Sequence, residues 1–106
     1  MKALDTETVR RLRGEILELV YEGHHAQRSR LTDLILWGVL KRLQYDVSQN
    51  DVLTTLQDLS DRKYLSFTED RNERTGVVRI TQIQITPSGR DLVEGTKSDL
   101  AVHVIV

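Results

Sequence analysis

The first quarter of the chain repeats apolar residues at helical spacing. They form one stripe along a helix, made up of Val9, Leu12, Ile16, Leu17, Leu19 and Val20. Asp5 or Thr6 is suited to cap the start of this helix, and Gly23 is suited to its end. We therefore expect a helix over residues 6–22, followed by the polar loop "HHAQRS".

A second helix is expected over "RLTDLILWGVLKRL", with Ser29 as its cap. One face of this helix collects five apolar residues, namely Leu31, Leu34, Ile35, Val39 and Leu43. Leu36, Trp37 and Leu40 lie off that face and are more typical of a core than of an interface. A helix that is apolar on most sides is either buried on most sides or shares a surface with a partner.

A third helix should follow the short turn "QYDV". Ser48 caps it, and Asp51 three residues later gives a capping-box arrangement. Its inward residues are Val52, Leu53, Leu56 and Leu59. At 100° per residue, its outward face holds Asn50, Thr54, Gln57, Asp58 and Asp61.

Two strand-like segments, "YLSFTED" and "VVRITQIQIT", flank the polar loop "RNERTG" and predict a β-hairpin with a charged tip. In the second segment Val78 and Ile80 fall on one face, whereas Ile83 and Ile85 fall on the other. This change of parity predicts a bulge or strong twist near residues 81–82, where the strand leaves the core to become a projecting ribbon.

The chain ends with a short helix and an apolar tail. Thr86 is expected to cap the helix, Pro87 to occupy its first position and Gly95 to follow its end. The tail "TKSDLAVHVIV" has a strong strand preference, and a free apolar terminus is an aggregation hazard. We expect it to pack on the first two helices or to pair with a second subunit.

This order of elements resembles the winged-helix family of helix-turn-helix domains over residues 6–95. The similarity lies in "VSQNDVLTTLQDLSDRKYLSF", which looks like the family's third helix running into the first wing strand, and in "ITPSGRDLVEG", which looks like its closing segment. The segments "LRGEILELVYEG", "YDVSQNDV" and "ITPSGRDLVEGT" are also similar to small winged-helix proteins of Mu-like prophages.

The resemblance implies an α+β fold with a three-helix helix-turn-helix core, a β-hairpin wing, a short C-terminal helix and an apolar tail. Residues 1–106 would form a single domain, with its core at 6–95 and its tail at 96–106. It also implies a transcriptional regulator of phage, prophage or bacterial type, with the third helix in the major groove of double-stranded DNA and the wing on the backbone. We expect a homodimer, formed through the apolar second helix or the C-terminal tail.

Carried onto this chain, the resemblance gives two sets of DNA contacts. The candidates for base contact are Gln49, Asn50, Thr54 and Gln57. The candidates for phosphate contact are Arg28, Arg30, Arg62, Lys63, Arg71, Arg74 and Arg79.

The charge distribution opposes this interpretation. The formal net charge is -1, so no global basic field indicates a nucleic-acid partner. Residues 44–70 hold six acids and two bases, a local charge of -4. Asp58 is placed to pair with Arg62 one turn later, whereas Asp61 has no such explanation. The alternative is therefore a winged-helix interaction module that binds a basic protein surface through the acidic third helix, without DNA.

Other functions find little support in the residues. The chain has no cysteine, and the adjacent His24 and His25 make poor paired metal ligands without a third or fourth ligand. Ser29, His24 and Asp33 lack a nucleophile-elbow pattern or a glycine-rich oxyanion loop. We expect neither enzyme activity nor a metal or cofactor. Without an apolar signal core or a membrane-spanning segment, a cytoplasmic protein is expected.

Overall fold

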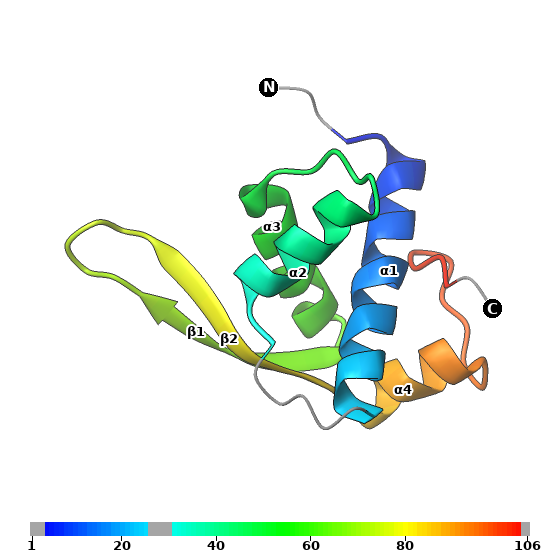
Figure 1. The fold of residues 1–106 in the computed structure, drawn as a ribbon. Helices are drawn as coiled ribbons and strands as arrows, with labels where there is room; N and C mark the ends of the chain where they lie inside the picture. The colour runs from blue at the N-terminus through cyan, green and yellow to red at the C-terminus, as the bar shows by residue number, and fades with distance from the viewer. Residues whose placement is uncertain (1–3, 26–30, 105–106) are drawn as a thin grey trace.

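The computed structural model describes residues 4–25 and 31–104, apart from the side chains of His24 and His25. Within these residues the chain has an α+β fold with four helices and a two-stranded antiparallel hairpin (Figure 1). The elements are α1 (Thr6–His25), α2 (Asp33–Arg42), α3 (Gln49–Asp61), β1 (Leu65–Arg71), β2 (Val78–Ile85) and α4 (Pro87–Glu94). In Figure 1 the hairpin projects from a body made of the helices.

Helix α1 supplies the centre of the core. Asp5 caps it, because an oxygen of its carboxylate accepts a hydrogen bond from the Thr8 amide at 2.7 Å. The predicted stripe is confirmed, with four fully buried members: Leu12, Ile16, Leu17 and Val20. The predicted end was wrong. The helix continues past Gly23 to His25, so His24 and His25 belong to α1 and not to a loop.

Helix α2 begins later in the chain than expected, and it buries two of the three residues expected in the core. Thr32 is the cap, its Oγ1 accepting from the Ile35 amide at 3.3 Å, whereas the expected cap Ser29 lies outside the described residues. Leu36 and Leu40 are buried. Their burial agrees with the expectation that the apolar residues off the main apolar face belong to the core. The apolar face itself supplies three exposed hydrophobic residues: Leu34, Ile35 and Leu43.

A buried carboxylate lies on the inward side of α2. Asp33, in the first turn of α2, is only 1% exposed. Its oxygens accept hydrogen bonds from Gln49 Nε2 at 3.1 Å and from the Ile80 amide at 3.4 Å. Because a buried carboxylate is tolerated when it is hydrogen-bonded, a polar residue can share the inward side of α2 with Leu36 and Leu40.

Helix α3 begins as predicted. Ser48 Oγ accepts from the Asp51 amide at 3.1 Å, and the Asp51 carboxylate accepts from the Ser48 amide at 2.9 Å, which completes the capping box. Its buried residues are Val52, Thr55, Leu56 and Leu59. The indole of Trp37 donates to the Val47 carbonyl at 2.9 Å and so joins α2 to the segment that leads into α3.

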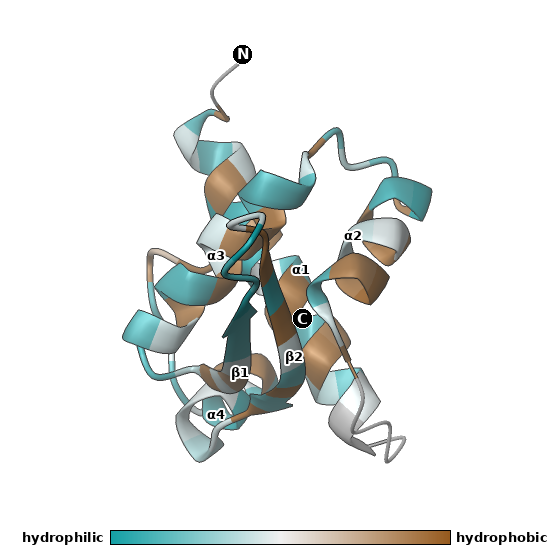
Figure 2. Ribbon diagram, turned by 90° about the vertical axis from the view of Figure 1, so that its left-hand side faces the viewer, coloured by the Kyte–Doolittle hydropathy of each residue, from teal (hydrophilic) through white to brown (hydrophobic). Residues whose placement is uncertain are grey.

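The hairpin carries the predicted bulge. Ser66 pairs with Gln84 and Thr68 pairs with Thr81, so one residue of β1 lies opposite two of β2. Gln82 has a φ of 52°, within the left-handed region. The extra residue restores the parity of the strand, because Ile80, Ile83 and Ile85 are all buried. In Figure 2 the hairpin is mostly hydrophilic toward its tip.

The fourth helix and its ends are confirmed. Thr86 Oγ1 accepts from the Gly89 amide at 3.1 Å, Pro87 is the first helical residue, and Gly95 follows in the left-handed conformation. Ile85 and Tyr64 approach Gly89 so closely that a Cβ there would lie 2.0 Å from the Tyr64 carbonyl oxygen. This contact fixes α4 against the base of the hairpin.

The tail folds back along α1 (Figure 1). The His103 amide donates to the Arg10 carbonyl at 3.1 Å, while the Arg10 and Arg13 guanidinium groups donate to tail carbonyls at 2.6 Å and 2.9 Å. The approach is close enough that a Cβ on Gly14 would lie 1.8 Å from the His103 carbonyl oxygen. The tail was expected on the first two helices or against a second subunit, and these contacts confirm its packing on α1.

Candidate nucleic-acid interface

The outward face of α3 is the first candidate surface. Asn50, Thr54, Gln57 and Asp61 are all exposed there, as the helical spacing predicts. The Gln57 amide lies 3.4 Å from a carboxylate oxygen of Glu69 on β1, so this face of α3 adjoins the hairpin. Three uncharged polar side chains and one carboxylate therefore line the helix beside the projecting hairpin.

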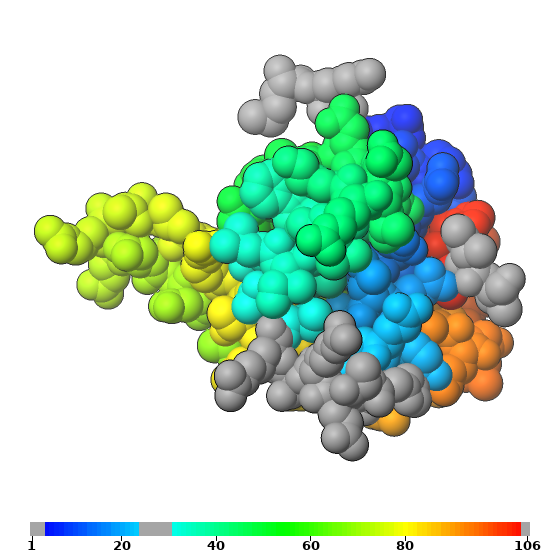
Figure 3. All heavy atoms as spheres, viewed as in Figure 1, coloured from blue at the N-terminus to red at the C-terminus, as the bar shows by residue number. Residues whose placement is uncertain are grey.

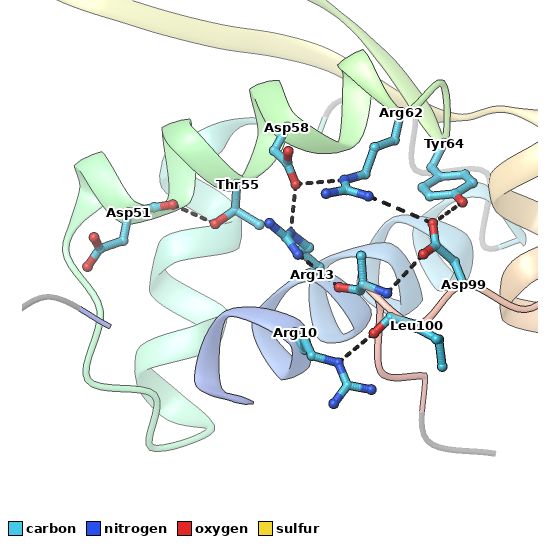
Figure 4. Close-up of polar contacts among 10 residues, drawn as sticks. Arg10, Arg13, Asp51, Thr55, Asp58, Arg62, Tyr64, Asp99 and Leu100 are labelled. Atoms are coloured by element: carbon cyan, nitrogen blue, oxygen red, sulfur yellow. Dashed lines mark hydrogen bonds and ion pairs between the residues drawn. The ribbon is translucent and has the colours of Figure 1, made fainter. Parts of the chain in front are cut away.

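Asp58 does not belong to this face, and the prediction that it points outward was wrong. One of its oxygens lies 2.7 Å from Arg13 Nε of α1 and 3.1 Å from Arg62 Nε (Figure 4). The Arg62 pair is the predicted one, whereas the Arg13 pair joins two helices. Asp58 thus faces α1, and the guanidinium groups of Arg13 on α1 and of Arg62 at the end of α3 compensate its charge.

The same network reaches the tail. A terminal nitrogen of Arg62 lies 4.0 Å from an oxygen of Asp99, and that carboxylate accepts hydrogen bonds from the Tyr64 hydroxyl and, at 2.9 Å, from the Ala101 amide (Figure 4). The bond from Tyr64 lowers the pKa of Asp99. Burial, together with the hydrogen bond to Asp99, raises the pKa of Tyr64 to about 12. Arg62, a predicted phosphate contact, is therefore paired with the carboxylates of Asp58 and Asp99.

Gln49 also has a partner within the fold. It is half-buried, and its amide nitrogen donates to the buried carboxylate of Asp33 at 3.1 Å. Asp51 serves the capping box, and its backbone carbonyl accepts from Thr55 Oγ1 at 2.7 Å. Of the four predicted base contacts, Asn50, Thr54 and Gln57 lie together on the exposed face, while Gln49 is directed to the core.

The predicted phosphate contacts are divided among several places. Arg71, Arg74 and Arg79 are exposed on the hairpin, and Lys63 is exposed just after α3. Asn72 Oδ1 accepts from the Arg74 and Thr75 amides at 2.9 and 3.2 Å, which orders the hairpin loop. Arg79 pairs with Asp70 across the strands, so a carboxylate is its register partner. Arg28 and Arg30 lie outside the described residues.

A pocket of about 760 Å³ lies elsewhere, between the start of α1 and the segment joining α2 to α3. Its lining includes Leu43, Tyr45, Asp46, Val47 and Asp51. No local pattern in the chain predicts this pocket, because its walls come from segments far apart in the sequence. Among the described residues, no group of three or more histidine or acidic side chains is arranged to hold a metal ion.

The polar network also includes Arg13, Tyr64 and Asp99, whose roles the sequence did not predict. No local pattern marks them, since each contacts its partner only in the folded chain.

No helix in the described part of the chain is long and apolar enough to cross a membrane. A comparison with models of known protein families gave no match, and a comparison with curated proteins gave none either.

Proposed function

We propose that this chain is a winged-helix protein that binds double-stranded DNA as a transcriptional regulator. Helix α3 would enter the major groove and the hairpin would lie along the backbone. Two features support the proposal: the order of three helices, hairpin and short helix, and the position of the hairpin beside the exposed face of α3.

The orientation of Asp58 carries the proposal. A carboxylate facing DNA weakens binding by repulsion and desolvation. Asp58 instead faces Arg13 and Arg62, so its charge is compensated away from the outward face. Asp51 completes the helix cap. Among the described residues of α3, Asp61 is then the acid that remains exposed beside Asn50, Thr54 and Gln57.

The exposed side chains have chemistry suited to base edges. Asn50 and Gln57 can each form paired hydrogen bonds with adenine, and the methyl group of Thr54 can contact that of thymine. Arg71 and Arg74 on the hairpin have the reach to contact phosphates. Base contacts would set sequence preference, whereas the hairpin arginines would contribute affinity for any duplex.

Salt dependence of binding tests the role of the hairpin. We expect the wild-type chain to bind random duplex in a fluorescence anisotropy titration at low salt. Arg71→Ala with Arg74→Ala should weaken binding to all sequences and lower the slope of log K against log salt by about 2, roughly one unit for each lost phosphate contact. Arg11→Ala with Lys97→Ala removes the same charge from α1 and from the segment after α4, away from the hairpin tip, and should leave the slope unchanged.

Sequence selection tests the role of α3. Selection from random duplexes should give a different preferred sequence for Asn50→Ala than for the wild type. Asp61→Asn should strengthen binding without changing that preference, because it removes a charge and no base contact. Absence of duplex binding by the wild-type chain at low salt would refute the proposal.

One observation favours a second candidate, a basic protein partner. Asp46 and Asp51 line the pocket at the start of α3 together with the apolar side chains of Leu43 and Val47. Such a combination suits a basic segment with an apolar anchor. If duplex DNA is not bound, Asp46→Asn should weaken capture of a basic peptide library, whereas Asp61→Asn, outside the pocket lining, should not.

A further inference from the structure

A carboxylate of the hairpin lies beside the outward face of α3. Glu69 of β1 accepts a hydrogen bond from the amide nitrogen of Gln57 at 3.4 Å, and both side chains are exposed. The register partner of Glu69 on β2 is Ile80, which is fully buried. Because side chains directly opposite each other on paired strands share one face of the hairpin, Glu69 projects from the face that meets the helices. Asp70 and Arg79, the next pair, project from the other face.

Buried contacts hold the strand that carries Glu69 in place against α3. The Asp33 carboxylate of α2 accepts from the Ile80 amide at 3.4 Å and from Gln49 Nε2, at the start of α3, at 3.1 Å. A closed series of contacts therefore runs from Gln49 through α2 and both strands of the hairpin to Gln57, about two turns further along α3. In Figure 3 the base of the hairpin lies against α2, whereas its outer part stands clear of the body. The fold itself thus sets the position of Glu69 relative to Gln57.

The Glu69 carboxylate determines which way the Gln57 amide faces. An ionised carboxylate accepts hydrogen bonds and donates none, so the amide directs its nitrogen, and not its oxygen, to Glu69. The nitrogen carries two N–H groups, and one of them remains available together with the amide oxygen. Gln57 therefore presents one donor beside one acceptor in a fixed order.

A donor beside an acceptor matches the major-groove edge of adenine. Adenine offers its N7 as an acceptor and its amino group as a donor, whereas guanine offers two acceptors, N7 and O6. A glutamine amide that is free to turn can donate to the acceptors of guanine. An amide held by Glu69 instead places its oxygen against guanine O6, where two acceptors repel each other. The held amide should therefore discriminate adenine from guanine.

We propose that Glu69 is a positioning residue that fixes the Gln57 amide and so makes α3 select adenine over guanine at one base pair. This role rests on the proposed entry of α3 into the major groove, and it belongs to a hairpin residue that need not touch a base. The negative charge of Glu69 repels phosphates and lowers affinity. Loss of Glu69 should therefore weaken the selection of adenine without a general loss of binding.

Titrations of two related duplexes test this role. Sequence selection with the wild-type chain and with Gln57→Ala identifies the base pair whose preference depends on Gln57. Two duplexes that differ only at that pair, A·T in one and G·C in the other, are then titrated by fluorescence anisotropy. We expect the wild-type chain to bind the A·T duplex at least about tenfold more tightly. Glu69→Met keeps the length of the side chain but removes the acceptor, so it should reduce this ratio to about one and strengthen binding to the G·C duplex.

Asp70→Asn is the matched control. It removes a carboxylate from the opposite face of the same strand, so it should strengthen binding to both duplexes and leave their ratio unchanged. Glu69→Gln, whose amide can donate as well as accept, should give an intermediate ratio. In a Gln57→Ala chain, Glu69→Met should no longer change the ratio, because the two residues act through one contact. Circular dichroism should show an unchanged fold for Glu69→Met, since the side chain is exposed.

A Glu69→Met chain that keeps the wild-type ratio would overturn the role of Glu69. A base pair other than A·T as the one that depends on Gln57, or no such base pair at all, would overturn it as well. A wild-type chain that binds no duplex would instead refute DNA binding by α3, and the role of Glu69 with it. The wild-type titration alone distinguishes these two failures.

Discussion

Arg13 Nε of α1 lies 2.7 Å from a carboxylate oxygen of Asp58 on α3, and the two side chains are only 18% and 32% exposed. The pair joins helices that are distant in sequence, and Arg62 extends it toward the tail through Asp99. It therefore stabilises the packing of α1, α3 and the tail, and it also turns a negative charge away from the face of α3 that we propose to bind DNA.

Asp58→Asn should destabilise the fold. The substitution leaves the largely buried Arg13 guanidinium without its counter-charge, and we expect a loss of about 1–3 kcal/mol in the free energy of unfolding. Urea denaturation gives the value. Asp61→Asn, an identical change at an exposed position of the same helix, should alter stability by less than about 0.5 kcal/mol. Equal effects of the two variants would contradict a structural role for the Arg13 pair.

Gln49→Ala should also reduce stability. The side chain donates to Asp33, and its removal leaves an oxygen of a buried carboxylate with one donor fewer, at a cost of about 1–3 kcal/mol. Asn50→Ala, next in sequence but exposed, should change the unfolding free energy by less than about 0.5 kcal/mol. A stable Gln49→Ala chain with impaired DNA binding would instead assign Gln49 to base contact.

The effect of Gly14→Ala should change sign when the tail is removed. In the intact chain the added Cβ would collide with the His103 carbonyl, and such overpacking costs about 1–3 kcal/mol. In a chain that lacks residues 98–106 the collision is gone, and alanine should stabilise α1 by about 0.5–1 kcal/mol. Thermal melts of the four chains test this. An unchanged penalty after truncation would show that the tail is not its cause.

Glu18 should make stability depend on pH near neutrality. Its pKa in the folded chain, about 7, lies above its ordinary value of 4.5, so between these pH values the folded chain binds more protons than the unfolded chain. Stability from this group is therefore fully present below pH 4.5 and is lost as the pH rises through 7.

Glu18→Gln should accordingly raise the melting temperature at pH 8 by a few degrees and have little effect at pH 4. Solvent screening keeps the change small, because the side chain is only half-buried. Glu73→Gln, on the exposed hairpin loop, is the control and should have no effect at either pH. A Glu18→Gln melting curve that follows the wild type at pH 8 would contradict the raised pKa.

Local chemistry in the sequence was sufficient to predict most elements and their ends. Ser48 with Asp51, and Thr86 with Pro87, mark helix starts through contacts within a single turn, and the structure has those contacts. The change of parity between Ile80 and Ile83 likewise predicted the bulge, because side chains alternate strictly along a strand. These signals need no knowledge of the fold.

The orientation of side chains was harder to predict. In α2, Leu36 and Leu40 are buried as expected, whereas the polar Asp33 was an unexpected member of the core. Asp58 points toward α1 because Arg13 is there, a partner far away in the chain. In the proposed site, the exposure of Asn50, Thr54 and Gln57 followed from helical spacing. That Arg13 compensates the charge of Asp58 could be learned only from the tertiary structure.

The Asp33 carboxylate has a consequence for the divergence of this fold. One buried side chain joins the start of α2, the start of α3 and the strand β2 through Gln49 and the Ile80 amide. A mutation at position 33 leaves Gln49 without its acceptor, and a mutation at position 49 leaves the carboxylate short of a donor. In descendants of this sequence, positions 33 and 49 should therefore vary as a pair, with apolar residues entering both together.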